Sequence, residues 1–488
     1  MAGMEPKWKI TRQRDFTGGE NRVASFDLLA ANQIYLGMNC VLAADGSLET
    51  RKGKTQINTT SLGAGKVIAA FRWAKENGTK YLTVQHGTTL YNAVWDGVST
   101  VSSFTSVKTG LAADVKLRGV VWKDNLILVN GVQNNFRFDG TTSTDLAGTP
   151  PKSTLISVYA SRIWINDVAS PNLIRFSDLE SYDVFDTLNV VKFRSGDGEV
   201  ITGLASQSGG MVVFKSSSMW TLYGSSIDNI RVDILNDNFG TISPDSILAD
   251  GFFVGPDNLY RFSLSSVSPF APTHRTYITP LNTLQKQAIA AVYLPLDQRI
   301  IVTLRDYRQL CIDVQTNAVF TWAGLNVCSL SAATTTGDDG SLILGDANNG
   351  LLYIINNIED DAGAGIPTDV QLAYTDMNIC TDKVFRAIRP TLEVVHPRTG
   401  HASVASIIYD IDHTNSGFAQ TTPLYNAVMK WDDELWNSKE WGGPHGAENI
   451  FVFHFSERGR FISLRTTSQA RIKVKGFELK FRYIGRDL

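Results

Sequence analysis

Short runs of β-branched and aromatic residues alternate with turn residues along most of the chain. Gly, Asn, Asp and Ser bound the runs, which is the pattern of strands joined by tight turns. Clear examples lie at 80–84, 125–129 and 299–303. Helical spacing is found only loosely, where Phe26, Leu29 and Ile34 recur within residues 26–35. The pattern therefore predicts an all-β chain with one short helical element near its N-terminus.

One unit of this pattern recurs: an apolar strand, a short turn and a strand that carries an aromatic residue. Copies of the last strand lie at 89–91, 135–138, 173–176, 219–223, 258–262, 309–312 and 351–354. Successive copies are about 38 to 51 residues apart, which matches a four-stranded propeller blade. Stacked blades bury faces that no single blade covers, and a closed ring protects the edges. We expect a six- or seven-bladed β-propeller over residues 56–360, and a chain of small β-sandwiches stays open as the alternative.

The pattern changes after residue 358. The acidic, glycine-containing run 359–365 predicts a linker. Beyond it, strands are expected at 391–395, 403–409, 450–455 and 460–464. Residues 471–483 alternate almost strictly and predict a half-exposed hairpin whose inward side chains are Ile472, Val474, Phe477, Leu479, Phe481 and Tyr483. We therefore expect a C-terminal β-sandwich over residues 366–488, and a third unit, 1–55, made of an arm and the helical element.

Composition narrows the classes of function. The chain has 488 residues and a formal net charge of −3, which excludes a globally basic nucleic-acid coat. Its longest apolar stretch, 288–296, is about nine residues, so we expect no membrane span. The first residues are charged and have no apolar core, so we expect no secretory signal. Four widely spaced cysteines predict neither a zinc cluster nor a disulfide framework.

Motifs that would indicate catalysis are missing from the sequence. It has no Gly-x-Ser-x-Gly elbow and no Gly-x-x-x-x-Gly-Lys-Ser/Thr loop. The carboxylates that gather after two predicted strands are Asp178, Glu180, Asp183, Asp237 and Asp245. We expect them to be solvated loop residues, and we expect His396 and His401 to flank a turn rather than bind a metal. The prediction is that the protein is not an enzyme and has no catalytic residue, cofactor or metal.

Two segments are candidate partner interfaces. In the first, positive charge is interleaved with an aromatic ring, in Lys7, Trp8, Lys9, Arg12 and Arg14. Such a segment suits phosphates or an acidic protein surface, and the alternative is an exposed arm with ordinary charge. In the second, Trp431, Trp436 and Trp441 are spaced by five, which fits neither one helix face nor one strand face. We expect at least one of these rings to enter a neighbouring protein, unless the three cover an edge of the C-terminal sandwich.

Several motifs follow one another in an order that resembles one protein family. They are Asn39, Asp45-Gly46-Ser47-Leu48 and Arg51-Lys52-Gly53 within 37–54; Arg162-Ile163-Trp164 and Leu173-Ile174-Arg175-Phe176-Ser177-Asp178; Gly203-Leu204, Lys215, Met219-Trp220 and Gly224; Asn238-Phe239-Gly240-Thr241-Ile242-Ser243; and Gly255-Pro256-Asp257-Asn258-Leu259-Tyr260. Each is a generic β-turn pattern, so the specificity lies in their order over residues 35–265. In that order the chain resembles the tail nozzle of short-tailed bacteriophages, also called the DNA-stabilisation or hub protein.

The resemblance implies a structural virion protein, made in the host cytoplasm and located in the phage tail. Such proteins form a ring of identical subunits, usually a hexamer, below the portal and its adaptor. The ring extends the DNA channel, retains packaged DNA and supports genome ejection. Implied partners are further copies of the chain, the adaptor or head-to-tail connector, tail fibres, spikes or a tip plug, and double-stranded DNA that passes without sequence specificity. The family has no catalytic residues to carry over.

Two other classes of function stay open. A tail-tip adhesin would bind host cells as an isolated protein. A propeller-type glycosidase acting on host polysaccharide would need carboxylates that converge on one funnel, and it would release reducing sugar.

Overall fold

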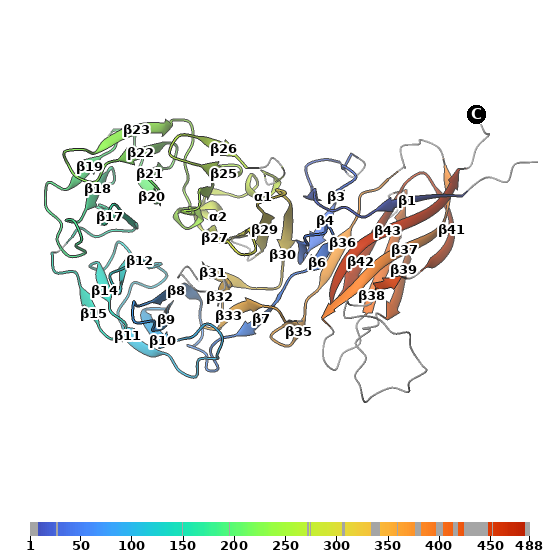
Figure 1. Ribbon diagram of the computed structural model, residues 1–488, viewed down its shortest axis with the longest axis horizontal. Helices are drawn as coiled ribbons and strands as arrows, with labels where there is room; N and C mark the ends of the chain where they lie inside the picture. The colour runs from blue at the N-terminus through green and yellow to red at the C-terminus, as the bar shows by residue number, and fades with distance from the viewer. Residues whose placement is uncertain are drawn as a thin grey trace, which may run out of the picture. The chain divides into compact units, whose positions relative to one another are not determined.

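A computed structural model describes residues 8–483, apart from 26–27, 149, 195, 271–272, 274, 305–307, 333–341, 359, 376–381, 397–403, 413–417, 424–447 and 451. The chain forms two compact units (Figure 1). We call residues 55–310 and 325–355 the propeller unit, and residues 1–54, 311–324 and 356–488 the terminal unit. Among the described residues, no helix is long and apolar enough to span a membrane.

The propeller unit is built from small antiparallel sheets that follow one another along the chain. The first two sheets contain β8 (Val67–Ala74), β9 (Lys80–His86), β10 (Thr89–Val94) and β11 (Thr105–Lys108), then β12 (Arg118–Trp122), β13 (Asn125–Val129), β14 (Phe136–Phe138) and β15 (Ser143–Asp145). The next two contain β16 (Ile156–Tyr159), β17 (Arg162–Asn166), β18 (Leu173–Phe176) and β19 (Val190–Lys192), then β20 (Ile201–Gln207), β21 (Gly210–Lys215), β22 (Met219–Tyr223) and β23 (Arg231–Asn236).

The later sheets of this unit are less regular. They contain β24 (Phe252–Val254), β25 (Leu259–Phe262) and β26 (Val267–Pro269); β27 (Ala290–Leu294) and β28 (Arg299–Thr303), followed by β29 (Gln309–Asp313); and β31 (Val327–Ala332), β32 (Leu342–Asp346) and β33 (Leu352–Asn356). Three short helical turns interrupt them, η1 (Pro244–Ser246), α1 (Arg275–Ile278) and α2 (Thr283–Gln287).

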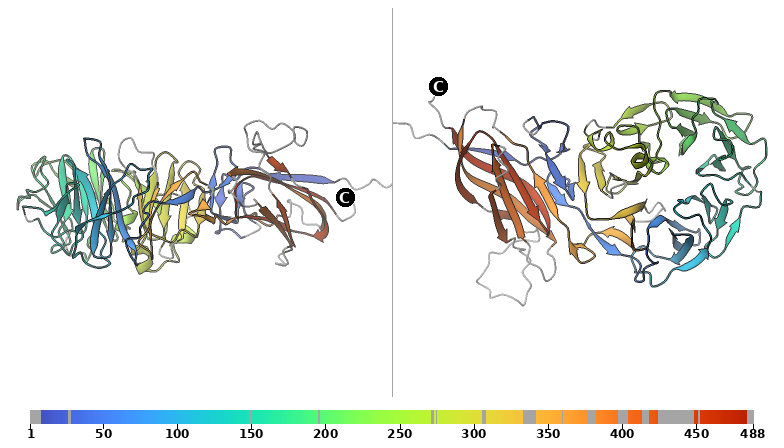
Figure 2. Two further views of the ribbon diagram at one scale, coloured as in Figure 1. Left: turned by 90° about the horizontal axis from the view of Figure 1, so that it is seen from below. Right: turned by 180° about the vertical axis from the view of Figure 1, so that it is seen from behind.

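These sheets are arranged as the blades of a closed ring (Figures 1 and 2). The first strands β8, β12, β16 and β20 contact one another in turn, β24 and β27 both contact η1, and β31 contacts β27 and returns to contact β8. One buried cluster, which includes Val67, Leu82, Ile343 and Leu352, joins the first and last blades. The prediction of an all-β protein with a β-propeller is confirmed, with a blade number in the predicted range.

Strand alternation explains how the blades stack. In β17, Ile163 and Ile165 pack with Ile127 of the preceding blade, whereas Trp164 packs with Val213 of the following blade. Because successive side chains point to opposite faces of a strand, one short apolar strand supplies two cores. This is why the buried blade strands appear in the sequence as continuous apolar runs.

The terminal unit combines strands from both ends of the chain. They are β1 (Lys9–Gln13), β2 (Gly19–Glu20), β3 (Gln33–Ile34), β4 (Leu36–Met38), β5 (Cys40–Leu42), β6 (Leu48–Thr50), β7 (Gly53–Gln56), β30 (Val319–Trp322), β34 (Asp360–Asp361), β35 (Ala364–Gly365), β36 (Thr368–Gln371), β37 (Lys383–His396), β38 (Val404–Ile411), β39 (Phe418–Pro423), β40 (Glu448–Ile450), β41 (Phe453–Gly459), β42 (Ile462–Ser468) and β43 (Arg471–Tyr483). One sheet has the order β40-β37-β43-β6-β5, with β1 on β43 and β41 on β37, and the other runs β30-β4-β36-β42-β38-β39.

The two sheets share one hydrophobic core, and this changes the predicted domain organisation. Cys40, Leu42 and Leu48 of the N-terminal strands are buried in the same core as Phe385 and Leu464. Residues 1–55 are therefore not a separate arm, and residues 366–488 do not form a sandwich by themselves. The sequence patterns of the N-terminal strands are too short to show which distant strands they pair with.

Two local predictions also differ from the structure. The described part of 26–35 contains the short strand β3 and no helix, which agrees with the loose helical spacing there. The alternation in 471–483 is correct, but the segment is one continuous strand rather than a hairpin. Its pairing with β37 shifts register next to Gly476, so an irregularity replaces the expected turn. A Cβ on Gly476 would lie 2.6 Å from the carbonyl oxygen of Gln13, so glycine lets β1 approach.

Candidate functional site

The motif Arg51-Lys52-Gly53 holds a β-hairpin inside the terminal unit. The Arg51 side chain is fully buried, and its guanidinium pairs with both carboxylate oxygens of Asp361. Its Nε donates to Asn39 Oδ1 at 3.1 Å. A Cβ on Gly53 would lie only 2.0 Å from the carbonyl oxygen of Asp360, so no larger residue fits there. Within the predicted linker 359–365, residues 360–365 therefore form a hairpin of β34 and β35, and the buried arginine binds one of its acidic residues.

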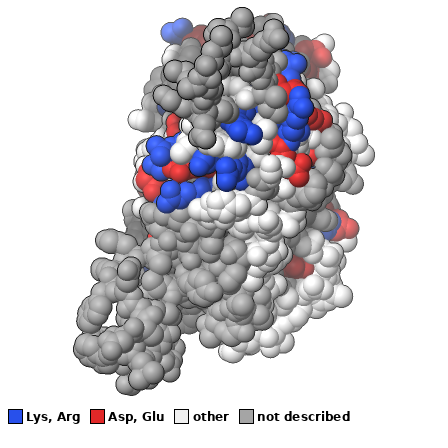
Figure 3. Space-filling view, turned by 90° about the vertical axis from the view of Figure 1, so that its right-hand side faces the viewer, with Lys and Arg blue, Asp and Glu red and all other residues white. Residues whose placement is uncertain are grey.

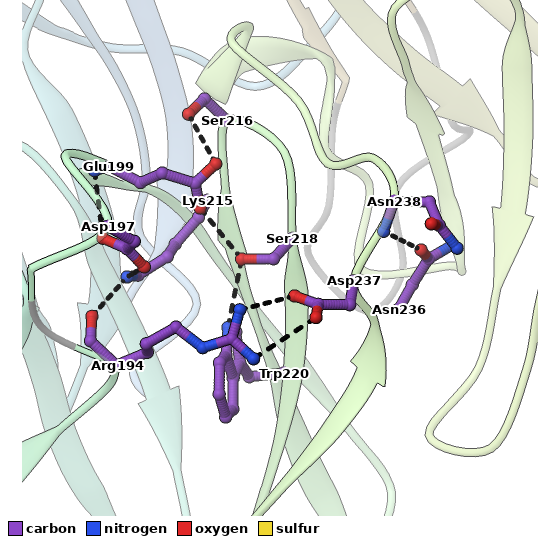
Figure 4. Close-up of polar contacts among 10 residues, drawn as sticks. All are labelled: Arg194, Asp197, Glu199, Lys215, Ser216, Ser218, Trp220, Asn236, Asp237 and Asn238. Atoms are coloured by element: carbon purple, nitrogen blue, oxygen red, sulfur yellow. Dashed lines mark hydrogen bonds and ion pairs between the residues drawn. The ribbon is translucent and has the colours of Figure 1, made fainter.

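A second polar network anchors the loop before β20 in the propeller unit (Figure 4). The side chain of Lys215 is fully buried, and its Nζ donates to Asp197 Oδ2 and to the Arg194 carbonyl oxygen, both at 2.7 Å. The hydrogen bond from Lys215 lowers the pKa of Asp197. Glu199 accepts hydrogen bonds from Ser216 at 3.4 Å and from Ser218 at 3.0 Å. The loop is thus held to the buried ammonium group of Lys215 through Asp197.

The same region explains one of the predicted carboxylates. Asp237 forms a two-pronged ion pair with Arg194, at 2.8 and 3.3 Å. The Arg194 guanidinium lies over the Trp220 ring, 5.3 Å from its centroid. Figure 4 shows the ion pair beside the ring. The arrangement fixes a loop, and it places no pair of free carboxylates side by side.

Another carboxylate links two parts of the propeller unit that are distant in sequence. Arg118 of β12 donates to both oxygens of Asp245 in η1, at 2.8 and 3.0 Å, and Lys116 Nζ lies 3.3 Å away. Burial raises the pKa of Asp245, but the charges of Lys116 and Arg118 outweigh it and lower the pKa to about 2. Asp245 therefore acts as a structural tie between segments 127 residues apart.

Two further predicted carboxylates, Asp178 and Glu180, each bind a different partner. Asp178 accepts a hydrogen bond from Asn189 at 2.7 Å, and Glu180 pairs with Lys123 at 2.7 Å. The hydrogen bond from Lys123 lowers the pKa of Glu180, whereas a general acid of a glycosidase needs a raised one. Within the described ranges, no group of three or more His, Cys, Asp or Glu side chains is placed to hold a metal ion. His401 lies outside those ranges.

The predicted N-terminal residues Arg12 and Arg14 meet one buried carboxylate on β43. Arg12 Nε donates to Glu478 Oε1 at 2.7 Å, and Arg14 Nη2 reaches the same oxygen at 3.0 Å. Arg389 of β37 lies 3.5 Å from the other oxygen. Burial raises the pKa of Glu478, but Arg12, Arg389 and Arg14 outweigh it and lower the pKa. Three guanidinium groups thus share one negative charge.

Trp8 collects a second group of cations, which we call the Trp8 cluster. Arg386, Lys480 and Arg482 lie 5.1, 5.7 and 5.1 Å from its ring centroid. No carboxylate of the described residues forms an ion pair with any of the three. Sequence reasoning missed them, although Lys480 and Arg482 occupy the outward positions of a strictly alternating strand.

The other predicted interface residues divide into two groups. Lys9 Nζ donates to the Tyr483 hydroxyl at 3.4 Å and lies 4.5 Å from its ring centroid. Lys7, Trp431, Trp436 and Trp441 lie outside the described residues. Of the predicted interface residues that the structure describes, Trp8, Lys9, Arg12 and Arg14 all lie on the sheet that contains β43.

No protein-family model matches the chain, and neither does any curated protein. Solved structures similar to it include the extracellular domain of the one-component system BT4673 from B. thetaiotaomicron, at 12% sequence identity and a TM-score of 0.44. That match covers 83% of this chain and 59% of the other, so the chain spans less than two thirds of that domain.

Two further similar structures share the same low identity. YCF48 bound to D1 peptide has 11% identity and a TM-score of 0.39, with 62% of this chain and 95% of that one covered. PorZ, a bacterial surface component of the type-IX secretion system of Porphyromonas gingivalis, has 10% identity and a TM-score of 0.40. That match covers 62% of this chain and 37% of PorZ. The likeness to these proteins concerns the fold alone.

Proposed function

We propose that the chain is a structural protein of a bacteriophage tail, which forms a ring below the portal and adaptor and extends the DNA channel. The observation that carries this proposal is the order of the nozzle-like motifs along residues 35–265. Several of these motifs hold a strand or loop in place, as the contacts of Arg51, Arg162 and Gly240 illustrate, which supports the proposal.

The motif around β17 and β18 illustrates these tasks. Arg162 Nη1 donates to the Ser177 carbonyl oxygen at 2.7 Å, and the backbone N–H of Ile163 donates to Ser177 Oγ at 2.9 Å. Trp164 is fully buried and stacks on Phe176 with ring centroids 4.5 Å apart. Arginine, tryptophan and serine at these positions therefore close one blade hairpin.

Two other motifs meet each other directly. The carbonyl oxygen of Lys215 accepts from the backbone N–H of Thr241 at 3.1 Å. A Cβ on Gly240 would lie 2.0 Å from that same carbonyl oxygen. Ser243 Oγ then donates to the Ile289 carbonyl oxygen at 2.7 Å. The Asn-Phe-Gly-Thr-x-Ser run thus joins a blade to the segment that follows it.

In this proposal, the subunits assemble as a closed ring, most simply a hexamer as in the family that the chain resembles. The ring conducts double-stranded DNA without reading its sequence and contacts the adaptor on one side and fibres, spikes or a tip plug on the other. No contact described above specifically favours the adhesin or the glycosidase.

Immunogold labelling of virions of the phage that encodes the chain tests the proposal. Antibodies against the purified protein should label the tail just below the head. Label on fibres or on peripheral spikes alone, or no label on intact and disrupted virions, would contradict it.

A further inference from the structure

Strand β1 forms an open edge of the terminal unit. Within the described part of the chain it pairs with β43 alone, so its other edge presents backbone N–H and C=O groups. The side chains from Lys9 to Arg12 are exposed. An unpaired edge of this kind is a template on which an extended segment of another protein adds a strand.

A groove lies along the inner side of this edge. It has a volume of about 480 Å³ and runs beside residues 9–13. Leu372, Leu464, Leu479 and Phe481 contribute apolar side chains to its lining. These leucines are largely buried in the core between the two sheets, so the groove gives access to the margin of that core. Apolar side chains that enter it would meet this margin, next to the polar residues Gln13, Gln33 and Thr375 of the same lining.

The outer face of the sheet behind this edge carries a group of basic side chains with some acidic ones among them (Figure 3). Its cations are Arg12, Arg14, Arg386, Arg389, Lys480 and Arg482, and the carboxylate that pairs with some of them is Glu478. Arg12 and Arg14 keep 57% and 64% of their side-chain surface exposed. Like charges gathered around Trp8 repel one another, and an anionic partner relieves that repulsion.

We propose that the open edge of β1 binds an extended segment of a partner protein in which acidic and apolar residues alternate. Added as a strand, the segment points alternate side chains to opposite faces, about 6.6 Å apart on each face. The apolar set enters the groove, and the acidic set lies on the outer face beside Arg12, where it feels the field of the Trp8 cluster on the strands behind β1. DNA offers neither a backbone that continues a β-ladder nor apolar side groups, so a protein strand fits the three features together.

This inference goes beyond the proposed function and stands without it. If the chain forms a tail ring, a neighbouring tail protein supplies the strand. A negative result in the peptide experiment below would say nothing about whether the protein lies in the tail. Likewise, a negative result in the labelling of virions would not affect the proposed binding of a peptide strand.

The test uses the full chain and synthetic peptides of about ten residues that alternate Glu and Val. Isothermal titration should show binding about tenfold tighter than for a peptide of the same composition with Glu and Val in separate blocks. N-methylation of alternate peptide nitrogens on the bonding edge should abolish binding, because it removes the ladder hydrogen bonds.

Variants of the basic face provide the second arm. The double substitution Lys480→Gln with Arg482→Gln should weaken binding of the alternating peptide about tenfold and reduce its salt dependence. Lys473→Gln is the matched control, because Lys473 lies on the same strand and already pairs with Asp45 at 2.8 Å. It should bind the peptide like the unmodified chain, with melting temperatures checked for all variants.

Three results would overturn the proposal. Equal binding of block and N-methylated peptides would exclude strand addition. Tighter binding of a DNA duplex of about 20 base pairs, lost in the double variant, would assign the face to nucleic acid. Self-association of the chain that the double variant abolishes would make a second copy the occupant.

Discussion

Replacement of Arg51 by Met should destabilise the terminal unit strongly. The fully buried guanidinium pairs with Asp361, whose side chain is only 9% exposed, and also donates to the carbonyl oxygen of Lys52 at 3.1 Å. Met fills most of the volume but leaves the Asp361 carboxylate buried without a counter-charge. Breaking a buried ion pair in this way costs about 3 to 5 kcal/mol of unfolding free energy.

The double variant Arg51→Met with Asp361→Leu separates charge from packing. Because an apolar pair of similar volume often replaces a buried ion pair at little cost, the double variant should recover most of the loss. A cycle of the two single variants and the double variant then gives the coupling free energy between the two side chains.

Native-state hydrogen exchange measures the loss of stability in the terminal unit separately from the propeller unit. The free energy of opening of β5, β6 and β36 should fall by about 3 to 5 kcal/mol in Arg51→Met, while β13 and β17 of the propeller unit serve as the internal control. The role given to this ion pair would be refuted if the opening free energy in Arg51→Met decreased by less than about 1 kcal/mol. It would also be refuted if the double variant were as unstable as Arg51→Met.

The remaining predictions concern the propeller unit. Because the pKa of Asp245 is lowered to about 2 in the folded state, its ion pair contributes about 2 kcal/mol above pH 4. This contribution should be lost as the pH falls from 4 towards 2. In Arg118→Gln, the unfolding free energy measured in urea should therefore depend less on pH in this range, and an unchanged pH dependence would contradict the role given to the ion pair. Trp164→Ala should lower stability by about 3 to 5 kcal/mol, measured by exchange in β17 and β18, and a loss below about 1 kcal/mol would mean that the stack contributes little. Assays for released reducing sugar should detect no turnover, and turnover that Glu180→Ala abolishes would favour the glycosidase.

The propeller was predictable because each blade carries its own local pattern. Strand, turn and aromatic strand lie within one stretch of sequence, and Ile163, Trp164 and Ile165 show their two-sided burial as a continuous apolar run. Neighbouring blades are also neighbours in sequence, so the spacing of the repeat is enough to predict the ring.

The terminal unit was not predictable in the same way, because its pairings join distant residues. Arg12 meets Glu478 from 466 positions away, and Arg51 meets Asp361 from 310 positions away. Short strands of two to five residues carry too little pattern to select such partners. For this reason, an acidic hairpin resembled a linker, and the N-terminal strands resembled a separate arm.

The basic face was predictable only in part. The sequence showed cations interleaved with Trp8, but not that Arg386 of β37 would join Lys480 and Arg482 around the same ring. The alternation in 471–483 showed that Lys480 and Arg482 face outward. What the sequence lacked was the register that places β1 beside β43.

Averaged electron cryo-microscopy of tails, with the chain carrying a small tag, tests the central claim most directly. The account predicts that the tag lies in a closed ring of identical subunits around the DNA channel, below the adaptor, most simply with six-fold symmetry. A tag confined to peripheral three-fold spikes or fibres, or a tail whose channel wall lacks this chain, would contradict the account.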